Sequence, residues 1–393
     1  MTSPKLLRIT TVPVSLKILL RGQHRFMTGQ GFEVVGVSSA GSELEEVGTT
    51  EDIRTVVLAM TRAMTPWKDL KAIWQFYKLC KKERPLIVHS HTPKAGLVGM
   101  LGARLAGVPH RLHTVAGLPL TETTRMKRWL LDRVEKITYA CTTRVYPNSK
   151  GLHDFILQQR YTSAAKLSVL ANGSSNGIDT HYFDPIQVTE EQCHALRQSL
   201  GIAPTDFVFV FVGRMVKAKG LNELVAAFCR IRKSKGSRSR VKLLLVGNLE
   251  PELDPLSPET EKEIEANPNI IFVGYQQDVR PYFAISNCLV FPSYREGFPN
   301  VVMQAGAMGL PSIVSDINGC NEIVVAGRNG TLVPAKDTDT LATAMQHMVD
   351  DQVYHSQLRQ HAREMITSRY DQQLVWNALL AEYKRLSGEK GIV

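Results

Sequence analysis

An arginine and a lysine follow a run of apolar residues in the second half of the chain. The run reads Phe-Val-Phe-Val-Phe-Val over residues 207–212 and leads into Gly213, Arg214 and Lys219. We expect the run to form a buried strand of a parallel sheet, with both cations beyond its carboxyl end. A guanidinium forks two phosphate oxygens and an ammonium adds a point charge, so the pair suits a diphosphate. The alternative is a solvated loop with ordinary surface charges.

A carboxylate in a glycine-containing turn is the second candidate. Glu296 lies in the turn Arg-Glu-Gly-Phe-Pro-Asn of residues 295–300, and the mainly apolar segment 301–308 follows it. This pattern predicts a helix that begins near residue 300 and ends at Gly309. Because the free N–H groups at the start of a helix bind anions, this end would serve the same crevice as the two cations. Otherwise Glu296 is a surface acid in an ordinary loop.

Three histidines and a lysine are the candidates in the first half. His89 and His91 are two residues apart, and we expect that on a strand they would lie on opposite faces, so we expect no shared metal. Lys94 opens a predicted helix and could meet a phosphate. His113 follows another strand-like segment, and Gly117 just beyond it permits close approach of a ligand. The alternative for His113 is a structural hydrogen bond.

Strand-like runs alternate with helical stretches along the whole chain, which predicts an α/β fold with parallel sheets. We expect two Rossmann-like domains that face each other across a cleft, with ligands beyond the carboxyl ends of the strands. The predicted domains span 1–175 and 176–370, and a C-terminal helix over 371–393 is expected to cross back. The predicted strands are 6–12, 33–38, 55–58, 86–89, 111–115, 144–147, 207–212, 241–246, 270–273, 288–291 and 312–314, with helices over 70–82 and 96–106.

Length and composition favour a soluble protein of two domains. The 393 residues exceed one ordinary core, and 44% apolar with 21% charged residues is typical of globular chains. No apolar run approaches the ~20 residues of a membrane span, and no signal peptide is evident. Six scattered cysteines without a C-x-x-C pair favour a reducing compartment over a disulfide framework or a zinc site. We therefore expect a cytoplasmic location.

The net charge of +10 is concentrated in the first half of the chain. Residues 1–175 contain 25 Lys and Arg against 12 Asp and Glu, whereas the remainder has 22 against 25. The two halves therefore meet different partners, or the first has a merely soluble basic surface. No nucleic-acid motif accompanies the charge, so no nucleic acid is expected as a partner.

The stretch 124–143 is both basic and amphipathic. It either rests on an anionic membrane surface or packs its apolar face against the core. Its basic residues are Lys127, Arg128, Arg133 and Lys136, and its apolar residues are Met126, Trp129, Leu130, Val134 and Ile137.

One motif matches a metal-binding signature, but its position in the sequence does not favour metal binding. Asp337-Thr338-Asp339 has the D-x-D pattern of metal-dependent transferases, but it directly precedes the apolar helical run 341–348. We therefore expect it to cap that helix. Since the two cations can neutralise the diphosphate, no metal is expected.

The motifs together resemble the retaining family 4 glycosyltransferases. Those that carry the resemblance are Gly213-Arg214 with Lys219-Gly220, Glu296-Gly-Phe-Pro-Asn, and Asp-Ile-Asn-Gly-Cys-Asn-Glu over 316–322. Ser15-Leu-Lys17, Arg21-Gly-Gln23 and residues 89–96 are similar to the members that build bacterial capsular or exopolysaccharide repeat units. The resemblance covers nearly the whole chain.

This resemblance implies a GT-B fold, with the acceptor on the first domain and a nucleotide sugar on the second. Arg214 and Lys219 would bind the diphosphate, Glu296 the donor-sugar hydroxyls, and His113 would line the site near the transferred sugar. The donor-binding residues would be Gly213, Gly274, Tyr275, Gly297, Phe298, Pro299, Asn300, Val301 and Gln304, of which Gly274 and Tyr275 would lie against the nucleobase. The acceptor-binding residues would be Ser15, Lys17, His91 and Lys94.

The expected reaction moves a sugar from a nucleoside diphosphate, with UDP as the expected nucleotide, to a polyprenyl-diphosphate-linked or saccharide hydroxyl with retention. Neither a metal nor another cofactor is expected. One position departs from the family: Gln304 stands where a second glutamate usually holds the ribose hydroxyls, and an amide has only one acceptor oxygen. Two alternatives stay open, a non-catalytic nucleotide-sugar-binding subunit and another GT-B enzyme such as a nucleotide-sugar 2-epimerase.

Overall fold

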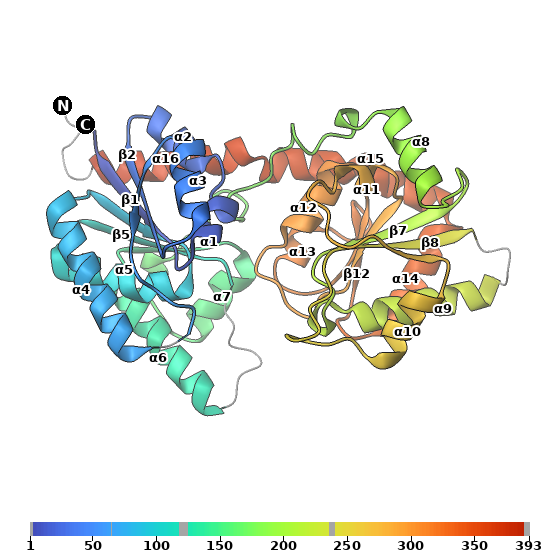
Figure 1. Cartoon of the computed structure of the whole chain (residues 1–393), viewed down its shortest axis with the longest axis horizontal. Helices are drawn as coiled ribbons and strands as arrows, with labels where there is room; N and C mark the ends of the chain where they lie inside the picture. Colours follow the sequence, from blue (N-terminus) through green and yellow to red (C-terminus); the bar gives the residue numbers. More distant parts are fainter. Residues whose placement is uncertain (1–2, 64, 118–124, 236–239, 389–393) are drawn as a thin grey trace. The chain divides into compact units, whose positions relative to one another are not determined.

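The chain folds into two compact units, each built on its own sheet (Figure 1). The computed structural model describes residues 3–63, 65–117, 125–235 and 240–388. Unit 1 consists of residues 1–177 and 372–393, and unit 2 of residues 178–371. The C-terminal helix is therefore part of unit 1. Among the described residues, no helix combines the length and the apolar character that crossing a bilayer requires.

Unit 1 contains a six-stranded parallel sheet in the order β3-β2-β1-β4-β5-β6. This is the Rossmann strand order. Strands β2 and β3 follow on one side of β1, and β4, β5 and β6 follow on its other side, so the strand order reverses between β1 and β4. The strands are β1 (Lys5–Ile9), β2 (Glu33–Ser38), β3 (Arg54–Val57), β4 (Ile87–Ser90), β5 (His110–Val115) and β6 (Arg144–Pro147). The helices are α1 (Pro13–Leu19), α2 (Gln23–Gly29), α3 (Ser42–Thr50), α4 (Pro66–Glu83), α5 (Pro93–Ala106), α6 (Arg125–Cys141), α7 (Lys150–Gln158) and α16 (Gln372–Gly388).

Unit 2 repeats this architecture. Its parallel sheet has the order β12-β11-β10-β7-β8-β9, so the strand order reverses between β7 and β10. The strands are β7 (Phe207–Val212), β8 (Val241–Val246), β9 (Ile270–Phe272), β10 (Cys288–Phe291), β11 (Ser312–Ser315) and β12 (Gly330–Val333). The helices are α8 (Glu190–Ser199), α9 (Leu221–Lys235), α10 (Pro258–Ala266), α11 (Arg280–Ala284), α12 (Asn300–Ala307), α13 (Cys320–Ile323), α14 (Thr338–Asp350) and α15 (Gln352–Tyr370).

Both faces of each sheet are buried, as the continuous apolar strands predict. In unit 1, Leu7 and Ile9 pack against α4 and α5, whereas the alternating Leu6 packs against α16. In unit 2 the four central residues of β7 are fully buried, and their neighbours on β8 and β10 belong to the same core. The prediction that residues 207–212 form a central strand is confirmed.

A polar network joins α16 to the sheet of unit 1. Arg8 on β1 is fully buried beside its register partner His89 on β4. The His89 ring contacts the hydroxyl of Tyr383 on α16 at 2.6 Å through Nδ1, and the hydroxyl of Thr114 at 2.8 Å through Nε2. Near the start of α16, the indole N–H of Trp376 donates to the side chain of Asn176 at 2.7 Å. These contacts account for the inclusion of the last helix in unit 1.

Candidate functional site

Two loops meet at the point where the strand order of the unit 2 sheet reverses, between β7 and β10. The loop after β7 holds Gly213, Arg214 and a single 3-10 turn (Lys217–Lys219), and the loop after β10 holds Glu296. The strands are hydrogen-bonded neighbours, so their carboxyl ends lie side by side. In open α/β sheets, ligands bind at this kind of position.

Lys219 and Glu296 form an ion pair within this crevice. Their side chains are only 18% and 14% exposed, so water screens the pair weakly. The hydroxyl of Ser293 donates to the same carboxylate oxygen of Glu296 at 2.7 Å. Lys219 Nζ also lies 5.1 Å from the ring centre of Phe291, the last residue of β10. The two residues predicted to share a site are therefore in direct contact.

A glycine lets the two loops approach this closely. Gly220 has a φ of 75° and lies against the backbone of Pro292, so that a Cβ at this position would stand 2.1 Å from the Pro292 carbonyl oxygen. The Tyr294 N–H donates to the Ala218 carbonyl at 2.9 Å and joins the same loops. The family motif thus needs glycine after Lys219 for two reasons, its backbone conformation and the space available.

A third segment supports the turn around Glu296. The side-chain amide of Asn318 donates to the carbonyls of Gly297 at 2.8 Å and Glu296 at 3.2 Å. Gly319, with a φ of 77°, packs against Gly297, and a Cβ here would lie 2.4 Å from the Gly297 carbonyl oxygen. The motif at 316–322 therefore shapes the Glu296 turn. Sequence reasoning singled out this motif but gave Asn318 no role.

Helix α12 begins at this turn, as predicted. Pro299 is its N-cap residue, and no side chain in the described part of the chain caps the first turn. The helix therefore presents unsatisfied N–H groups and its positive dipole end beside Glu296 and Lys219. With Gly297, Phe298, Asn300 and Val301, the turn supplies the backbone donors that suit an anion.

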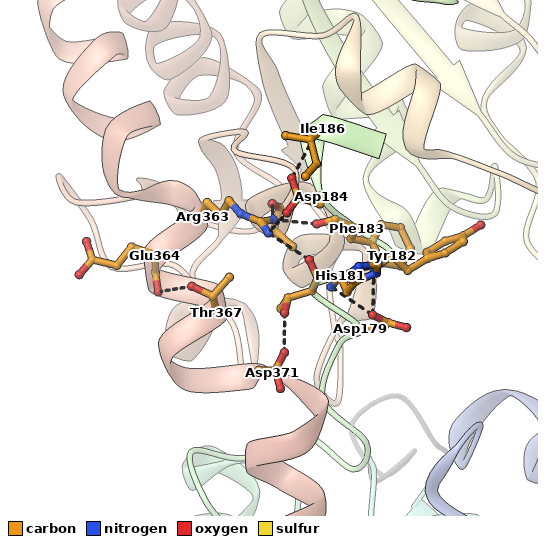
Figure 2. A network of polar contacts seen from close by, with 12 residues as sticks. Asp179, His181, Tyr182, Phe183, Asp184, Ile186, Arg363, Glu364, Thr367 and Asp371 are labelled. Atoms are coloured by element: carbon orange, nitrogen blue, oxygen red, sulfur yellow. Dashed lines mark hydrogen bonds and ion pairs between the residues drawn. The ribbon is translucent and has the colours of Figure 1, made fainter. Parts of the chain in front are cut away.

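The opposite end of α12 is held by an arginine that sequence reasoning missed. Figure 2 shows the guanidinium of Arg363 on α15, which forms an ion pair with Asp184 and donates to the backbone carbonyls of Thr180 and Phe183 at 3.0 and 2.9 Å. Arg363 also donates to the carbonyl of Ala307, the last residue of α12. It thereby satisfies a free carbonyl of the helix whose other end faces the site.

Arg214 lies on the loop after β7 but does not contact Glu296. Its side chain is 58% exposed and makes an ion pair with Glu250 at 3.2 Å. Exposed ion pairs of this kind contribute little to stability, so the guanidinium can exchange Glu250 for another anion at small cost.

The remaining predicted donor residues lie on other loops of unit 2. Gly274 and Tyr275 follow β9, where the Gly274 carbonyl accepts from the N–H of Gly247 at 2.8 Å and Tyr275 is 68% exposed. Gln304 lies on α12 and is half-buried, and its side chain has no hydrogen-bond partner among the described residues. An exposed aromatic ring and a free amide are both available to a ligand.

The predicted acceptor residues follow β1 and β4, the two strands between which the strand order of the unit 1 sheet reverses. Ser15 and Lys17 lie on α1 after β1, and Lys17 pairs with Glu46 at 2.7 Å. Lys94 lies after β4, but its side chain is only 8% exposed and pairs with Asp69 at 2.5 Å. Its charge is therefore neutralised inside the unit, which does not fit the expected contact with a phosphate.

His91 does not occupy the position expected from the sequence. It follows the end of β4, and its ring lies beside that of His89, with the ring centres 4.1 Å apart and the ring planes tilted by 34°. The prediction that the two rings lie on opposite faces is wrong, because the alternation of an extended chain places residues two apart on the same face. His91 is 4% exposed, so its side chain is enclosed in the core of unit 1.

His113 on β5 is a buried histidine with a structural hydrogen bond. Its Nδ1 lies 2.8 Å from the hydroxyl of Ser90, and the ring packs against Gly96, where a Cβ would come within 2.6 Å of Cε1. Burial lowers the pKa of His113 to about 4, so the ring is neutral at pH 7. This geometry is the structural alternative that the sequence left open, and it requires glycine at position 96.

The low pKa of His113 predicts that unit 1 loses stability in mild acid. Its folded pKa lies below the ordinary value of 6.5, so the unfolded chain binds the proton more readily. Stability is therefore full above about pH 6.5 and falls as the pH drops toward 4, by about 2 kcal/mol at pH 5. Burial also lowers the pKa values of His24, His89 and His91, which adds to this loss.

Urea unfolding at pH 7 and pH 5, followed by tryptophan fluorescence, tests this prediction. All four tryptophans of the chain lie in unit 1, so the signal reports that unit. His113→Asn keeps a polar partner for Ser90 but cannot take up a proton. Between the two pH values it should lose about 2 kcal/mol less than the wild type. Equal losses in both proteins would refute the assignment of this proton to His113.

Asp337 caps a helix, as expected. Its carboxylate accepts from the N–H groups of Asp339 and Thr340 at 3.1 and 2.9 Å at the start of α14. The D-x-D pattern is explained by this cap, since the first aspartate is occupied by the backbone of its own helix.

Three apolar residues of α6 lie on the surface of unit 1. Trp129, Leu130 and Ile137 are 58%, 44% and 48% exposed, whereas Val134 is half-buried. The side chains of Met126 and Lys127 lie outside the described residues. The alternative in which the apolar face packs wholly on the core is therefore wrong for these three residues, although α6 does pack on α5.

Comparison with known proteins identifies the class. The family described as "Glycosyl transferases group 1" matches residues 206–351, and the "Glycosyl transferase 4-like domain" matches residues 21–173. The capsular polysaccharide biosynthesis glycosyltransferase CapM of Staphylococcus aureus is 33% identical over 387 residues, covering 98% of this chain and 97% of CapM. The chain belongs to the group 1, family 4-like glycosyltransferases. The family predicted from the motifs is thereby confirmed.

A second relative supports this assignment, and a solved structure shows the same fold. A UDP-Gal:alpha-D-GlcNAc-diphosphoundecaprenol alpha-1,3-galactosyltransferase of Escherichia coli is 30% identical over 298 residues, or 76% of this chain and 75% of that enzyme. The crystal structure of HepE from Anabaena in complex with UDP and glucose matches with a TM-score of 0.80 at 18% identity, covering 98% of this chain and 100% of HepE. The two parallel six-stranded sheets are those of the predicted GT-B fold.

Proposed function

We propose that this protein transfers a sugar from a UDP-sugar to the hydroxyl of a lipid-linked or saccharide acceptor, with retention, in the synthesis of a surface polysaccharide. The observation that carries the proposal is the weakly screened ion pair of Lys219 and Glu296. It lies between the loops after β7 and β10, where the strand order of the unit 2 sheet reverses. A cation that binds the diphosphate and a carboxylate that binds sugar hydroxyls belong at one point of a nucleotide-sugar site. The Escherichia coli relative is named for a UDP-Gal donor and HepE was crystallised with UDP, which supports the choice of nucleotide.

The proposed chemistry is electrostatic. When the bond between the sugar and the β-phosphate breaks, negative charge develops on the phosphate. Lys219, Arg214 and the first N–H groups of α12 stabilise this charge, because they are held in place before the reaction starts. Arg214 turns from Glu250 to the diphosphate, and Lys219 is shared between the diphosphate and Glu296. Since these groups neutralise the leaving phosphate, we propose that transfer needs no metal.

Recognition of the nucleoside is assigned to neighbouring groups of unit 2. Tyr275 and Gly274 contact the base, and Gln304 contacts the ribose through its free amide. The amide in place of the usual carboxylate lowers donor affinity by about 1 kcal/mol. The acceptor is assigned to unit 1. Two relatives of the chain, from Escherichia coli and Campylobacter jejuni, are named for diphospho-undecaprenol substrates, which supports a lipid-linked acceptor. We also propose a cytoplasmic protein in peripheral contact with the anionic membrane that contains such acceptors.

A nucleotide-release assay tests the proposed function. The full-length protein is incubated with UDP-, GDP- or dTDP-sugars and a membrane extract as the acceptor source, and the released nucleoside diphosphate is measured. We expect release of UDP that depends on the extract and continues after treatment with a chelator. Activity restored only by Mg²⁺ or Mn²⁺ would contradict metal independence. Tight binding of a nucleotide sugar without turnover of any donor would favour the non-catalytic alternative.

A further inference from the structure

The outer face of α4 carries two tryptophans and a leucine that the described residues of unit 1 leave largely exposed. Trp67, Leu70 and Trp74 are 86%, 58% and 55% exposed, although the opposite face of the helix is buried against α5. The spacing of three and four residues places all three on one stripe of the helix. Residues of this size at the surface of a soluble unit mark a contact with another partner.

The same helix has an excess of positive charge toward solvent. Lys68, Lys71, Lys78, Lys81 and Lys82 are exposed, and no carboxylate among the described residues pairs with any of them. The acids of α4 face the other way. Asp69 pairs with Lys94 at 2.5 Å, and Glu83 pairs with Lys5 at 2.8 Å and with Arg54 at 2.6 Å. Both carboxylates are thereby neutralised within unit 1, and the outer face keeps its full positive charge.

Trp74 is held in place before any partner arrives. Its ring stacks on Tyr77 with the ring centres 5.0 Å apart, and Lys78 Nζ lies 5.4 Å from the Trp74 ring centre. An ordered indole ring with a lysine side chain beside it loses little entropy on binding.

Helix α6 is a second helix of unit 1 with an exposed tryptophan and exposed basic residues. Helices α4 and α6 both pack against α5, and Figure 1 labels all three on this unit. On α6, Trp129 is 58% exposed, Arg133 lies over its ring at 5.2 Å, and Lys136 is exposed. Three of the four tryptophans of the chain thus lie exposed on these two helices, each beside basic residues.

We infer that the outer faces of α4 and α6 dock unit 1 on the headgroup layer of an anionic phospholipid membrane. Tryptophan prefers the interface between water and hydrocarbon, and lysine stems bury their methylenes while the ammonium groups reach the lipid phosphates. A basic helix face with tryptophan and leucine is the pattern of an interfacial helix. A second copy of this chain fits less well, because two such faces would repel each other. The inference rests on the proposed membrane contact and names the surface that makes it.

Sedimentation with vesicles tests this inference on the full-length protein. The vesicles contain phosphatidylglycerol and phosphatidylethanolamine, and phosphatidylcholine vesicles serve as the neutral comparison. Wild type should bind the anionic vesicles, weakly in high salt, and should bind the neutral vesicles at least tenfold less. Trp67→Ser with Trp74→Ser should lower the binding constant about tenfold or more. Lys71→Glu with Lys78→Glu should lower it at least 25-fold, because each basic residue near an anionic surface contributes about fivefold.

Matched controls come from exposed residues of unit 2. Ile186→Ser with Val353→Ser removes two exposed apolar side chains, and Lys262→Glu with Arg359→Glu makes the same change in net charge as the lysine pair of α4. Both controls should bind vesicles like the wild type. If the α4 variants bind like their controls, the assigned surface is wrong, although the membrane contact stands.

Two further outcomes separate the inference from the rest of the account. If the wild type binds no anionic vesicles at low salt, both the membrane contact and its surface are refuted, whereas UDP release in the assay above is unaffected. If the wild type is a dimer in sedimentation velocity and the tryptophan variant a monomer, with vesicle binding unchanged, the face belongs to a second copy and the inference is overturned.

Discussion

Replacing Lys219 by alanine is expected to lower kcat/KM for sugar transfer about 1000-fold while leaving the protein folded. The ammonium lies in a weakly screened crevice against Glu296, where its charge acts more strongly than in water. Loss of one preorganised group that stabilises developing charge typically costs a factor of 10² to 10³. Here the loss also leaves the Glu296 carboxylate unpaired beside the diphosphate.

Lys217→Ala is the matched control for this prediction. Lys217 lies in the same 3-10 turn, but its side chain is exposed. We expect its transfer rate to stay within about twofold of the wild type. Steady-state kinetics with the donor found in the release assay, together with circular dichroism of both variants, makes the comparison. A rate for Lys219→Ala that matches the control would remove Lys219 from the reaction.

Replacing Gly220 by alanine should destabilise unit 2 and inactivate the enzyme. Its Cβ would stand 2.1 Å from the Pro292 carbonyl oxygen, and its φ of 75° lies in the left-handed region. The strain of the backbone and the displacement of the loop together should cost about 3 to 5 kcal/mol. Displacing this loop also separates Lys219 from Glu296.

Gly327→Ala separates the two causes. Gly327 has a φ of 73°, but no neighbouring atom of the residues that the structure describes lies within 4 Å of a Cβ built there. It should therefore cost only about 1 to 2 kcal/mol and keep transfer activity. Urea unfolding followed by circular dichroism measures the difference, because tryptophan fluorescence reports unit 1. Equal losses of stability in the two variants would show that the contact with Pro292 contributes nothing.

Most of the fold could be predicted because buried parallel strands are marked by continuous apolar runs. Residues 207–212, 241–246 and 288–291 form strands with the predicted boundaries. Strand β12 was not predicted. Its four residues at the sheet edge include Gly330, where a Cβ would collide with the Ser312 carbonyl, so the position gives no apolar signal. Glycine is needed here because β12 pairs with β11 at this position. The sequence of one strand does not reveal which strand it pairs with.

The candidate site could be predicted only where a motif combines two chemical groups. Lys219 and Glu296 carry opposite charges within family motifs, and the structure joins them. Asn318 and Arg363 act through backbone carbonyls of distant segments, and no local pattern marks such contacts. Lys94 illustrates the reverse case. Its place at the start of a helix suggested a phosphate ligand, but Asp69, 25 residues earlier, neutralises it.

Titration calorimetry with UDP and with uridine tests the central claim, that Lys219 and the Glu296 turn hold the donor diphosphate. The wild type should bind UDP at least tenfold more tightly than uridine, because the two phosphates supply charge-assisted hydrogen bonds. In Lys219→Ala and in Arg214→Glu, the affinity for UDP should fall at least tenfold, while the affinity for uridine stays unchanged. Equal affinities of the wild type for UDP and uridine, or unchanged binding of UDP by both variants, would contradict the account.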